Sequence, residues 1–256
     1  MIHILFRAIP LTLAVLVAVS PAARGAEADV SSRVFQLNYE GTVKIRATTG
    51  VIRVNVWDRD EARVDVIKHC ETTDLLEYMR VDVESAFNSL SITTEIATAT
   101  GTFGETIDAG SVDLGLTIPR NAKLEIEATS ANIRIEAVRG EVRVKTTTGP
   151  VYVLNLAGSV TLESTHAPLQ GAFDIVRDEQ IIVVTNVHGS IHLQLPASLA
   201  AILRAHSVRG PVKCDFPLPL EEDPAGGQRV DGSVNGGGAH VTCEAENGGI
   251  LIRRRQ

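Results

Sequence analysis

The sequence predicts an all-β protein, built as a β-solenoid-like stack of short strands. Apolar and charged residues alternate, as in Glu141-Val142-Arg143-Val144-Lys145, and a period of two is typical of strands with one buried face. The alternation recurs at nine-residue steps, which indicates a structural repeat. No segment sustains a helical period, and the best helix candidate is the short stretch from Thr73 to Arg80.

The repeat consists of a small residue followed by apolar residues two and four positions later. Five successive units, each nine residues from the next, begin at Ala122, Ala131, Gly140, Gly149 and Gly158. The same pattern begins at Gly171, Gln180 and Gly189, earlier at Gly41 and Gly50, and further units open at Gly110, Gly210 and Gly248. Units of this kind cannot bury an apolar face alone, so they must stack on their neighbours.

Nine residues divide into a strand of about five residues and a turn of about four. Because nine is odd, an uninterrupted strand would flip its inward face at each step, so the turn must reset the phase. A glycine at the same place in each turn could do so by adopting a positive φ. The spacing permits two architectures, a β-solenoid with ladders of equivalent residues or an antiparallel meander folded into a sandwich.

A longer echo overlies the short repeat. The passage from Gly110 to Gly140 contains Pro119, Ser130 and a Val-Arg-Gly ending, and the passage from Gly189 to Gly210 resembles it. Proline and serine are eleven residues apart in both passages, at 119 and 130 and at 196 and 207. The echo indicates two copies of one ancestral module.

Residues 1–28 have the three-part layout of a secretory signal. A charge at Arg7 precedes the apolar run from Ala8 to Val19, and small residues follow it. The apolar run is shorter than the roughly 20 residues that a membrane-spanning helix needs. Cleavage after Gly25 or after Ala28 fits the small-residue rule, and no cysteine follows the run to carry a lipid.

Residues 29–256 are expected to form a single domain of β-repeats. Stretches near 97–109 and 215–232 interrupt the repeat with Thr, Gly and Pro, and are predicted to be irregular loops. Removal of residues 1–28 changes the formal charge from −7 to −8. A mildly acidic chain favours solubility and argues against nucleic-acid binding.

Three cysteines allow one disulfide and one free thiol in an exported protein. Cys214 and Cys243 each lie four residues after the start of a repeat unit, at an inward position, whereas Cys70 follows His69 in no metal-binding spacing. If the strands of Cys214 and Cys243 are neighbours, the strand spacing of about 4.8 Å suits a disulfide. The sequence therefore predicts a possible disulfide between Cys214 and Cys243, with two buried free thiols as the alternative.

No pattern of residues predicts a catalytic, cofactor or metal site. His188 and His192 lie four apart, but no third ligand accompanies them. Four carboxylates between Asp58 and Asp65 follow Trp57 without the pattern of a calcium loop. No Gly-x-Ser-x-Gly elbow occurs, and Gly236-Gly237-Gly238 lacks the lysine and helix of a phosphate cradle. We therefore expect no enzyme activity and no cofactor.

The stretch from Gly50 to Val64, followed by Lys68, resembles the opening of a bacterial family of exported β-strand-repeat proteins. That family is known as a putative-adhesin domain of unknown function and is related to the head-GIN domains. The Leu116-Thr117-Ile118-Pro119 turn with the Gly-x-Val-x-Val units after it is similar to the same family, and the likeness covers roughly residues 33–256. The resemblance implies a β-solenoid-like fold and an envelope or extracellular location, and it implies no catalytic residues.

The sequence thus favours an exported, non-catalytic β-repeat scaffold, acting as an adhesin or envelope binding module in the periplasm, at the cell surface or outside the cell. Its expected partner is an envelope protein or a glycan, with no nucleic acid and no stable membrane span after signal removal. Two other classes stay open. One is a carbohydrate-active enzyme on a β-helix, whose acids would come from separate strands, and the other is an accessory component of envelope signalling.

Overall fold

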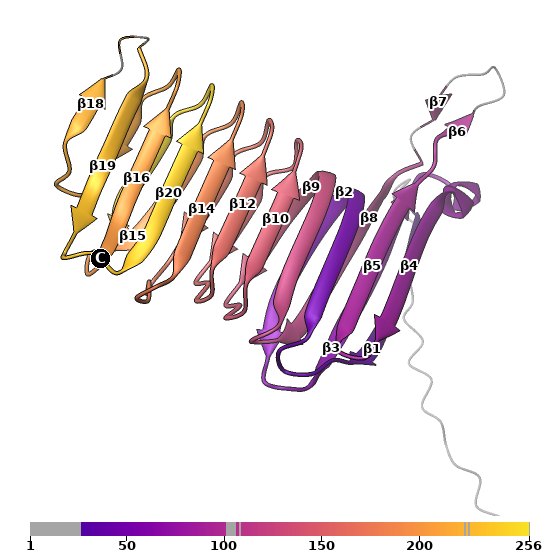
Figure 1. Cartoon of the computed structure of the whole chain (residues 1–256). Coiled ribbons are helices and arrows are strands. Elements are labelled where there is room, and N and C mark those ends of the chain that lie inside the picture. Colours follow the sequence, from indigo (N-terminus) through magenta and orange to yellow (C-terminus); the bar gives the residue numbers. More distant parts are fainter. Residues whose placement is uncertain (1–26, 101–105, 108, 223, 225, 256) are drawn as a thin grey trace, which may run out of the picture.

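The chain forms two β-layers stacked face to face (Figure 1). The computed structural model describes residues 27–100, 106–107, 109–222, 224 and 226–255. The layer nearer the viewer in Figure 1, called the front layer, contains β4 (Met79–Ala86), β5 (Ser89–Ile96), β10 (Val142–Thr146), β12 (Val160–Ser164), β14 (Ile181–Asn186), β16 (Ala201–Ser207), β18 (Leu220–Glu222), β19 (Gln228–Val234) and β20 (Ala239–Ala245).

The second layer, called the back layer, lies behind the front layer. It contains β1 (Glu27–Gln36), β3 (Glu61–Cys70), β8 (Ser111–Pro119), β11 (Val151–Leu154), β13 (Leu169–Ala172), β15 (Ile191–Pro196), β17 (Val212–Cys214) and β21 (Ile250–Arg255). Two long strands, β2 (Thr42–Trp57) and β9 (Lys123–Glu136), run through both layers, because their first halves pair in the front layer and their second halves in the back layer.

From β10 to β15, consecutive strands alternate between the layers, and each strand from β10 to β13 pairs in parallel with the strand two places later. β10 pairs with β12 in front and β11 with β13 behind, and Val142 lies opposite both Leu124 and Val160. One coil of the solenoid therefore takes 18 residues, which is two of the nine-residue units, one in each layer. The turn between the layers restores the alternation of inward and outward side chains, so that the same positions of each unit face the core. The β-solenoid-like prediction is confirmed, and the antiparallel meander is wrong for this region.

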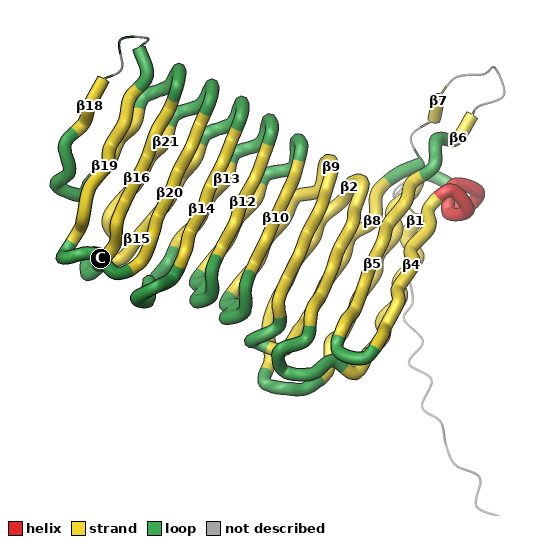
Figure 2. The backbone as a smooth tube through the Cα atoms, viewed as in Figure 1, coloured by secondary structure: helices red, strands yellow, loops and turns green. Residues whose placement is uncertain are grey.

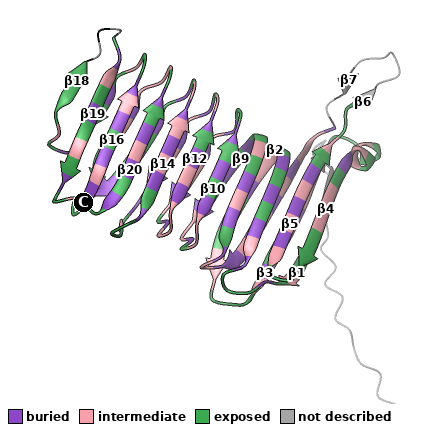
Figure 3. Ribbon diagram, viewed as in Figure 1, coloured by how far each residue is buried: buried purple, intermediate pink, exposed green. Residues whose placement is uncertain are grey.

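The core consists of the apolar residues that the repeat places two and four positions after each small residue. Val142, Val144, Val151 and Val153 expose 2% of their surface or less, and Figure 3 shows the alternation of buried and exposed residues along the strands. The layers are therefore held together by a continuous dry ladder of aliphatic side chains.

One repeat unit was placed wrongly by the sequence pattern. Gly171 lies inside β13 and not in a turn, and the unit begins four residues earlier, at Ala167. Phe173 is buried as predicted, but Ile175 is 69% exposed in the longer connection from β13 to β14. The coil from β12 to β14 takes 22 residues, because Val160 lies opposite Ile182, and these four extra residues broke the pattern.

Small residues recur in the turns because successive turns stack in contact along both edges (Figure 2). A Cβ on Gly149 would lie 1.8 Å from the carbonyl oxygen of Ala131, and one on Gly158 would lie 2.1 Å from that of Gly140. Neither Gly149 nor Gly158 has a positive φ. The predicted role of positive φ is therefore wrong for these turns, where glycine is needed because a side chain would collide with the turn below.

Two segments enter the stack out of sequence order. β2 lies between β9 and the β5 and β8 strands, and β20 and β21 lie between the β14–β15 coil and the β16–β17 coil, where the colours in Figure 1 change abruptly. The connections from β8 to β9 and from β15 to β16 therefore each skip one coil.

The two skipping connections share one local geometry. The amide of Arg120, directly after Pro119, donates to the carbonyl of Trp57 at 3.2 Å. The amide of Ala197, after the matching proline, donates in the same way to the carbonyl of Arg255 at 3.1 Å. The longer repeat in the sequence thus reflects two equivalent crossovers. Each crossover leaves a gap in the stack, which β2 fills in one case and β20 and β21 fill in the other.

The stretch 215–232, predicted to be an irregular loop, contains two strands instead. β19 pairs antiparallel with both β16 and β18, and it buries Val230 and Val234. Phe216, in the segment before β18, is also buried, at 4% exposed. The prediction failed because the prolines of this stretch lie before β18 and next to residues 223 and 225, which leaves the alternation of β19 intact.

The remaining elements are short. β6 (Ala99–Thr100) and β7 (Thr106–Ile107) pair antiparallel within the stretch 97–109 that was predicted to be a loop. The helix predicted over 73–80 is a 3₁₀ helix, η1 (Thr73–Tyr78), and β4 begins directly after it. The predicted signal of residues 1–28 lies outside the described residues except for its last two, which begin β1. Within the described chain, we find no helix that is long and apolar enough to cross a membrane.

Candidate functional site

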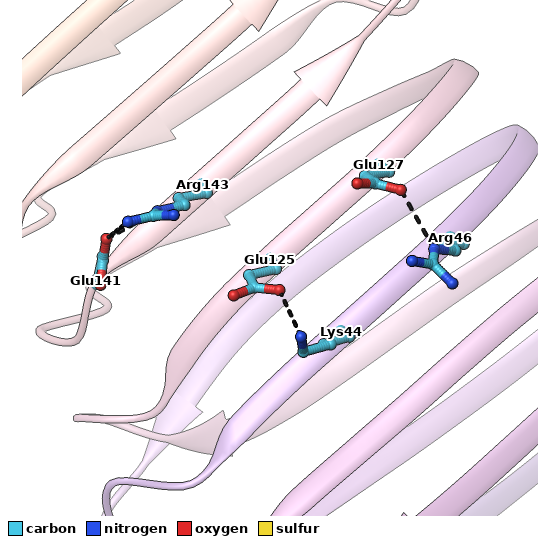
Figure 4. A network of polar contacts seen from close by, with 6 residues as sticks. All are labelled: Lys44, Arg46, Glu125, Glu127, Glu141 and Arg143. Carbon is cyan, nitrogen blue, oxygen red and sulfur yellow. Dashed lines mark hydrogen bonds and ion pairs between the residues drawn. The ribbon is translucent and has the colours of Figure 1, made fainter.

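The outer face of the front layer carries paired charges (Figure 4). Lys44 Nζ on β2 lies 3.0 Å from Glu125 Oε2 on β9, and Arg46 Nε lies 3.2 Å from Glu127 Oε2. All four side chains are at least 45% exposed, so each pair contributes only about 0–1 kcal/mol. Because the charges neutralise one another, this part of the face offers no excess of either sign to an ionic ligand.

These charge pairs are better explained as determinants of the strand register of β2 against β9 than as a binding site for a ligand. β2 enters the stack out of order, so its register against β9 needs its own determinants. A shift of two residues would keep the same apolar residues inward, but in one direction it would place Lys44 opposite Lys123. In the other direction it would place Arg46 opposite Thr129 and lose a charge pair. The observed register is the one that satisfies both pairs.

The carboxylates after Trp57 are held by arginines and form a polar turn. Asp58 accepts two hydrogen bonds from Arg120, from Nε at 2.9 Å and from Nη2 at 3.2 Å. The hydrogen bond from Arg120 lowers the pKa of Asp58 below its usual value, and the same bond raises the pKa of Arg120. Glu61 and Asp65 pair with neighbouring arginines at 3.3 and 3.0 Å. This cluster ties the end of β2 to the β8–β9 crossover.

His188 and His192, which the sequence places four apart, do not meet. His188 lies in the turn between β14 and β15, where its ring stacks on His166 with 4.9 Å between the ring centroids. Its Nδ1 lies 3.2 Å from Nδ2 of Asn247, and Arg209 donates to Oδ1 of Asn247 at 2.9 Å. These four residues occupy equivalent places in successive turns and form a side-chain ladder. Among the described residues, no group of three His, Cys, Asp or Glu side chains is arranged to hold a metal.

Cys214 and Cys243 are not joined by a disulfide in the structure. Cys243 on β20 is fully buried, and burial raises the pKa of its thiol to about 12, with the nearby Cys214 adding to the rise. Cys214 lies on β17, and burial raises the pKa of its thiol as well. The two strands belong to opposite layers, so the thiols face each other across the core and not along a sheet. The Cys214–Cys243 disulfide stays a prediction.

The outer face of the back layer has a hollow of about 310 Å³ whose lining includes one arginine and no carboxylate. Six outward side chains on three adjacent strands line it, namely Tyr152, Leu154, Gln170, Ala172, His192 and Gln194. Tyr152, Gln170 and His192 lie opposite one another in one row, and the other three form the next row. Arg255 bounds the hollow and is paired with Asp174 at 3.0 Å.

The hollow exists because β13 supplies small residues. Ala172 stands between the longer Leu154 and Gln194 in its row, so the surface dips there. The phenol, the two amides and the imidazole around the dip provide hydrogen-bond donors and acceptors. Charge returns on the flanking strands, with Arg134 on β9 and Arg253 on β21. This arrangement suits a neutral, hydroxyl-rich ligand lying flat on the sheet.

Comparison with known proteins places the chain in a family. The family model described as Toastrack DUF4097 matches residues 81–253, more than half of the chain. The chain belongs to the Toastrack DUF4097 family. This agrees with the predicted resemblance to exported β-repeat proteins of unknown function, and with the two-layer solenoid described above. Among curated proteins, none matches the chain in sequence.

Several solved structures are similar to this Toastrack chain. A putative cell adhesion protein from Clostridium sporogenes superposes with a TM-score of 0.52 at 12% identity, covering 90% of this chain and 100% of its own. A putative adhesin from Bacteroides fragilis gives a TM-score of 0.32 at 10% identity, with 88% and 97% covered. A putative lipid binding protein from Parabacteroides distasonis gives 0.30 at 10% identity, with 89% and 97% covered. The first of these likenesses shows the shared fold.

The hollow on the back layer was not found from the sequence. Its residues are ordinary outward positions of three repeat units, and no local motif marks them. The signal becomes visible only when the coil length is known, because Tyr152, Gln170 and His192 are 18 and 22 residues apart. Reading the sequence in coils of that length would align two consecutive outward rows that contain no Asp, Glu, Lys or Arg.

Proposed function

We propose that the protein is an exported, non-catalytic β-solenoid scaffold of the cell envelope that binds a glycan on the outer face of its back layer. The observation that carries the proposal is the hollow around Ala172, which has Tyr152, Gln170, His192 and Gln194 at its sides and no carboxylate in its lining. It is a concave area whose neighbouring strands present Arg134 on one side and Arg253 on the other.

Glycan recognition suits this chemistry. A sugar presents hydroxyl groups that both donate and accept hydrogen bonds, and an apolar ring face. Amide side chains such as those of Gln170 and Gln194 match the hydroxyls, and the Tyr152 ring offers a flat apolar surface with a polar tip. The row of three strands is about 10 Å long at the usual strand spacing. An extended chain could continue beyond it, towards Arg134 on one side and Arg253 on the other.

Export and adhesion are inferred from separate observations. Residues 1–28 have the layout of a cleaved secretory signal, which directs the rest of the chain out of the cytoplasm. The C. sporogenes protein that shares the fold is described as a putative cell adhesion protein. A stack with two broad outer faces gives an extended binding surface, which is how other solenoids engage partners.

The proposal of a non-catalytic module rests on the partners of the acidic side chains. Glu125 and Glu127 on the front layer pair with Lys44 and Arg46, and Asp58 pairs with Arg120. The residues that line the back-layer hollow include no carboxylate. A carbohydrate-active enzyme, the alternative function, would instead need two carboxyl groups on either side of one sugar bond.

The test is a binding assay on the purified exported chain with an array of chitin, cellulose and mannan oligosaccharides, followed by calorimetry on the best binder. Tyr152→Ala and Gln194→Ala are each expected to weaken binding about tenfold, because each removes a ring contact or a hydrogen bond in a desolvated contact. Thr161→Ala, an outward position of the front layer, is the matched control and should bind as the wild type does.

Two results would contradict the proposal. One is a wild-type chain that retains none of the oligosaccharides, and the other is binding that Tyr152→Ala and Gln194→Ala leave unchanged. Chromatography of the bound oligosaccharide after long incubation separates the enzyme alternative, since shortened products would show turnover. A signalling role would appear instead as capture of a membrane protein in the absence of glycan binding.

A further inference from the structure

The two layers end unevenly at the N-terminal end of the stack. Beyond β2, the back layer continues with β8, β3 and β1, whereas the front layer continues only with β5 and β4. β1 therefore projects by one strand. Among the described residues, β1 pairs only with β3, so the backbone groups along its other side are an open strand edge.

At the opposite end of the stack, the strands that project beyond the other layer are covered. There the front layer projects by two strands, β19 and β18. The chain covers this projection itself with Phe216, which is 4% exposed, and with Leu218, which packs against Gly232. The edge strand β18 has three residues, whereas β1 has ten. Short and covered edges are the usual protection against pairing, and β1 is neither short nor covered by any other strand in the described part of the chain.

β1 also has an unusual polarity. Its inward residues are Asp29, Ser31, Arg33 and Phe35, which line a hollow of about 220 Å³ between the layers together with Lys68 of β3, the residue opposite Asp29. Its outward residues include Val30 and Val34, which are 65% and 53% exposed. Apart from Phe35, the inward side chains of β1 in this hollow are thus polar and two of its valines face solvent, the reverse of the pattern in the rest of the stack.

We propose that β1 pairs antiparallel with β1 of a second copy of this chain, about a two-fold axis through Ser31. In this register Asp29 of each copy lies opposite Arg33 of the other, so two charge pairs form on the inward side. On the outward side, Val30 lies diagonal to Val30 and Val34 of the second copy, within reach of contact. The back layers of the two copies then join into one sheet.

The charge pattern favours a second copy over a simple blocked edge. Inward-pointing charges can protect an edge from pairing, and a pair of like charges would do so here. Asp29 and Arg33 are opposite in sign and four residues apart. An antiparallel strand of identical sequence therefore places its Arg33 opposite Asp29 and its Asp29 opposite Arg33. A two-fold dimer uses the same patch on both subunits, as this self-complementarity requires.

The experiment measures self-association of the whole exported chain by sedimentation equilibrium, with the mature N-terminus read by mass spectrometry. The wild type should form dimers that weaken with added salt, because the charge pairs are partly exposed. Asp29→Arg and Arg33→Asp alone each place like charges opposite one another twice, and should weaken the dimer about tenfold or more. An equal mixture of the two variants should form mixed dimers, since positions 29 and 33 are then both acidic in one chain and both basic in the other.

A cross-link tests the register. Ser31→Cys places two cysteines opposite each other at the axis, within the distance of a disulfide, and should give a covalent dimer on mild oxidation. Ser32→Cys, offset from its own copy by two residues, is the matched control and should stay uncrosslinked. A wild type that remains monomeric overturns the proposal, as does a dimer that neither charge variant weakens, or a Ser32→Cys dimer without a Ser31→Cys dimer.

Discussion

The stacked turns give the sharpest test of the physical account, through the substitution Gly149→Ala. A Cβ at this position would lie 1.8, 2.5 and 2.8 Å from the O, C and N atoms of Ala131. All three are backbone atoms of the turn below, so no side chain can rotate away and the two turns must separate. Overpacking of this kind costs about 1–3 kcal/mol and occasionally more. We expect about 3 kcal/mol, which corresponds to a fall in Tm of roughly 6–12 °C for a domain of this size.

The assay is urea and thermal unfolding followed by circular dichroism, with Gly115→Ala as the matched control. Gly115 lies in β8, has no positive φ, and its added Cβ would come no closer than 3.4 Å to Asp65. The same substitution should there be neutral or stabilising, because alanine restricts the unfolded chain more than glycine does.

Gly149→Asn separates the two possible reasons for a glycine in the turn. Asparagine tolerates positive φ, so it would be accepted if backbone conformation were the requirement. Because the requirement is space, Gly149→Asn should destabilise at least as much as Gly149→Ala. The reasoning is refuted if Gly149→Ala unfolds within about 0.5 kcal/mol of the wild type, the range of ordinary surface substitutions.

Three further predictions follow from the fold. Truncation after Gly238 removes β20, which lies between β14 and β16, and β21, which lies between β15 and β17. Limited proteolysis should therefore degrade the C-terminal coils of the truncated chain and leave those of the full chain intact. Lys44→Glu places like charges opposite each other and should cost about 0.5–1 kcal/mol, which Glu125→Lys restores in a double-mutant cycle; a coupling energy of zero would contradict the paired register. In reduced protein, the stability that the neutral Cys243 thiol confers is complete below the unfolded pKa near 9 and is lost as pH rises towards 12, at up to about 1.4 kcal/mol per pH unit. Cys243→Ala should remove this dependence of stability on pH. Oxidised protein should also lack it if Cys214 and Cys243 form a disulfide. A nonreduced digest that yields the two cysteine peptides separately alkylated would rule that disulfide out.

The repeat in the sequence predicts the core well, because inward positions follow from local alternation alone. Leu124, Ile126, Val142 and Val144 were all expected inward and are all buried. The unit at Gly171 failed because β13 begins at Leu169 and a four-residue insertion follows it, so that a local pattern in the wrong phase looked complete.

The order of the strands was not predictable from the repeat. A nine-residue unit carries the same inward pattern whichever coil it joins, so periodicity does not say that β2 or β20 enters out of sequence. The information lies in the crossovers, where Pro119 and Pro196 precede matching hydrogen bonds, and in the charge pairs of Lys44 and Arg46. The echo between the two passages was visible, but its meaning depends on three-dimensional neighbours.

The inserted strands bear on the proposed role as a scaffold. A simple solenoid can fray from its last coil, because each coil contacts only its neighbours. Here the C-terminal strand β21 is held between β15 and β17, so the end of the described chain is internal to the sheet. Such an arrangement resists local opening and proteolysis, which suits a binding module that works outside the cytoplasm.

The most direct test of this architecture is disulfide trapping across β20 in a background without the native cysteines. Thr242 lies opposite Val183 of β14 on one side and opposite Arg204 of β16 on the other, and all three side chains point outward. The inserted arrangement predicts that the cysteine pairs 183–242 and 204–242 both form disulfides on oxidation, while the pair 183–204, two strands apart, does not. A 183–204 disulfide with no 183–242 disulfide would place β14 beside β16 and contradict the insertion.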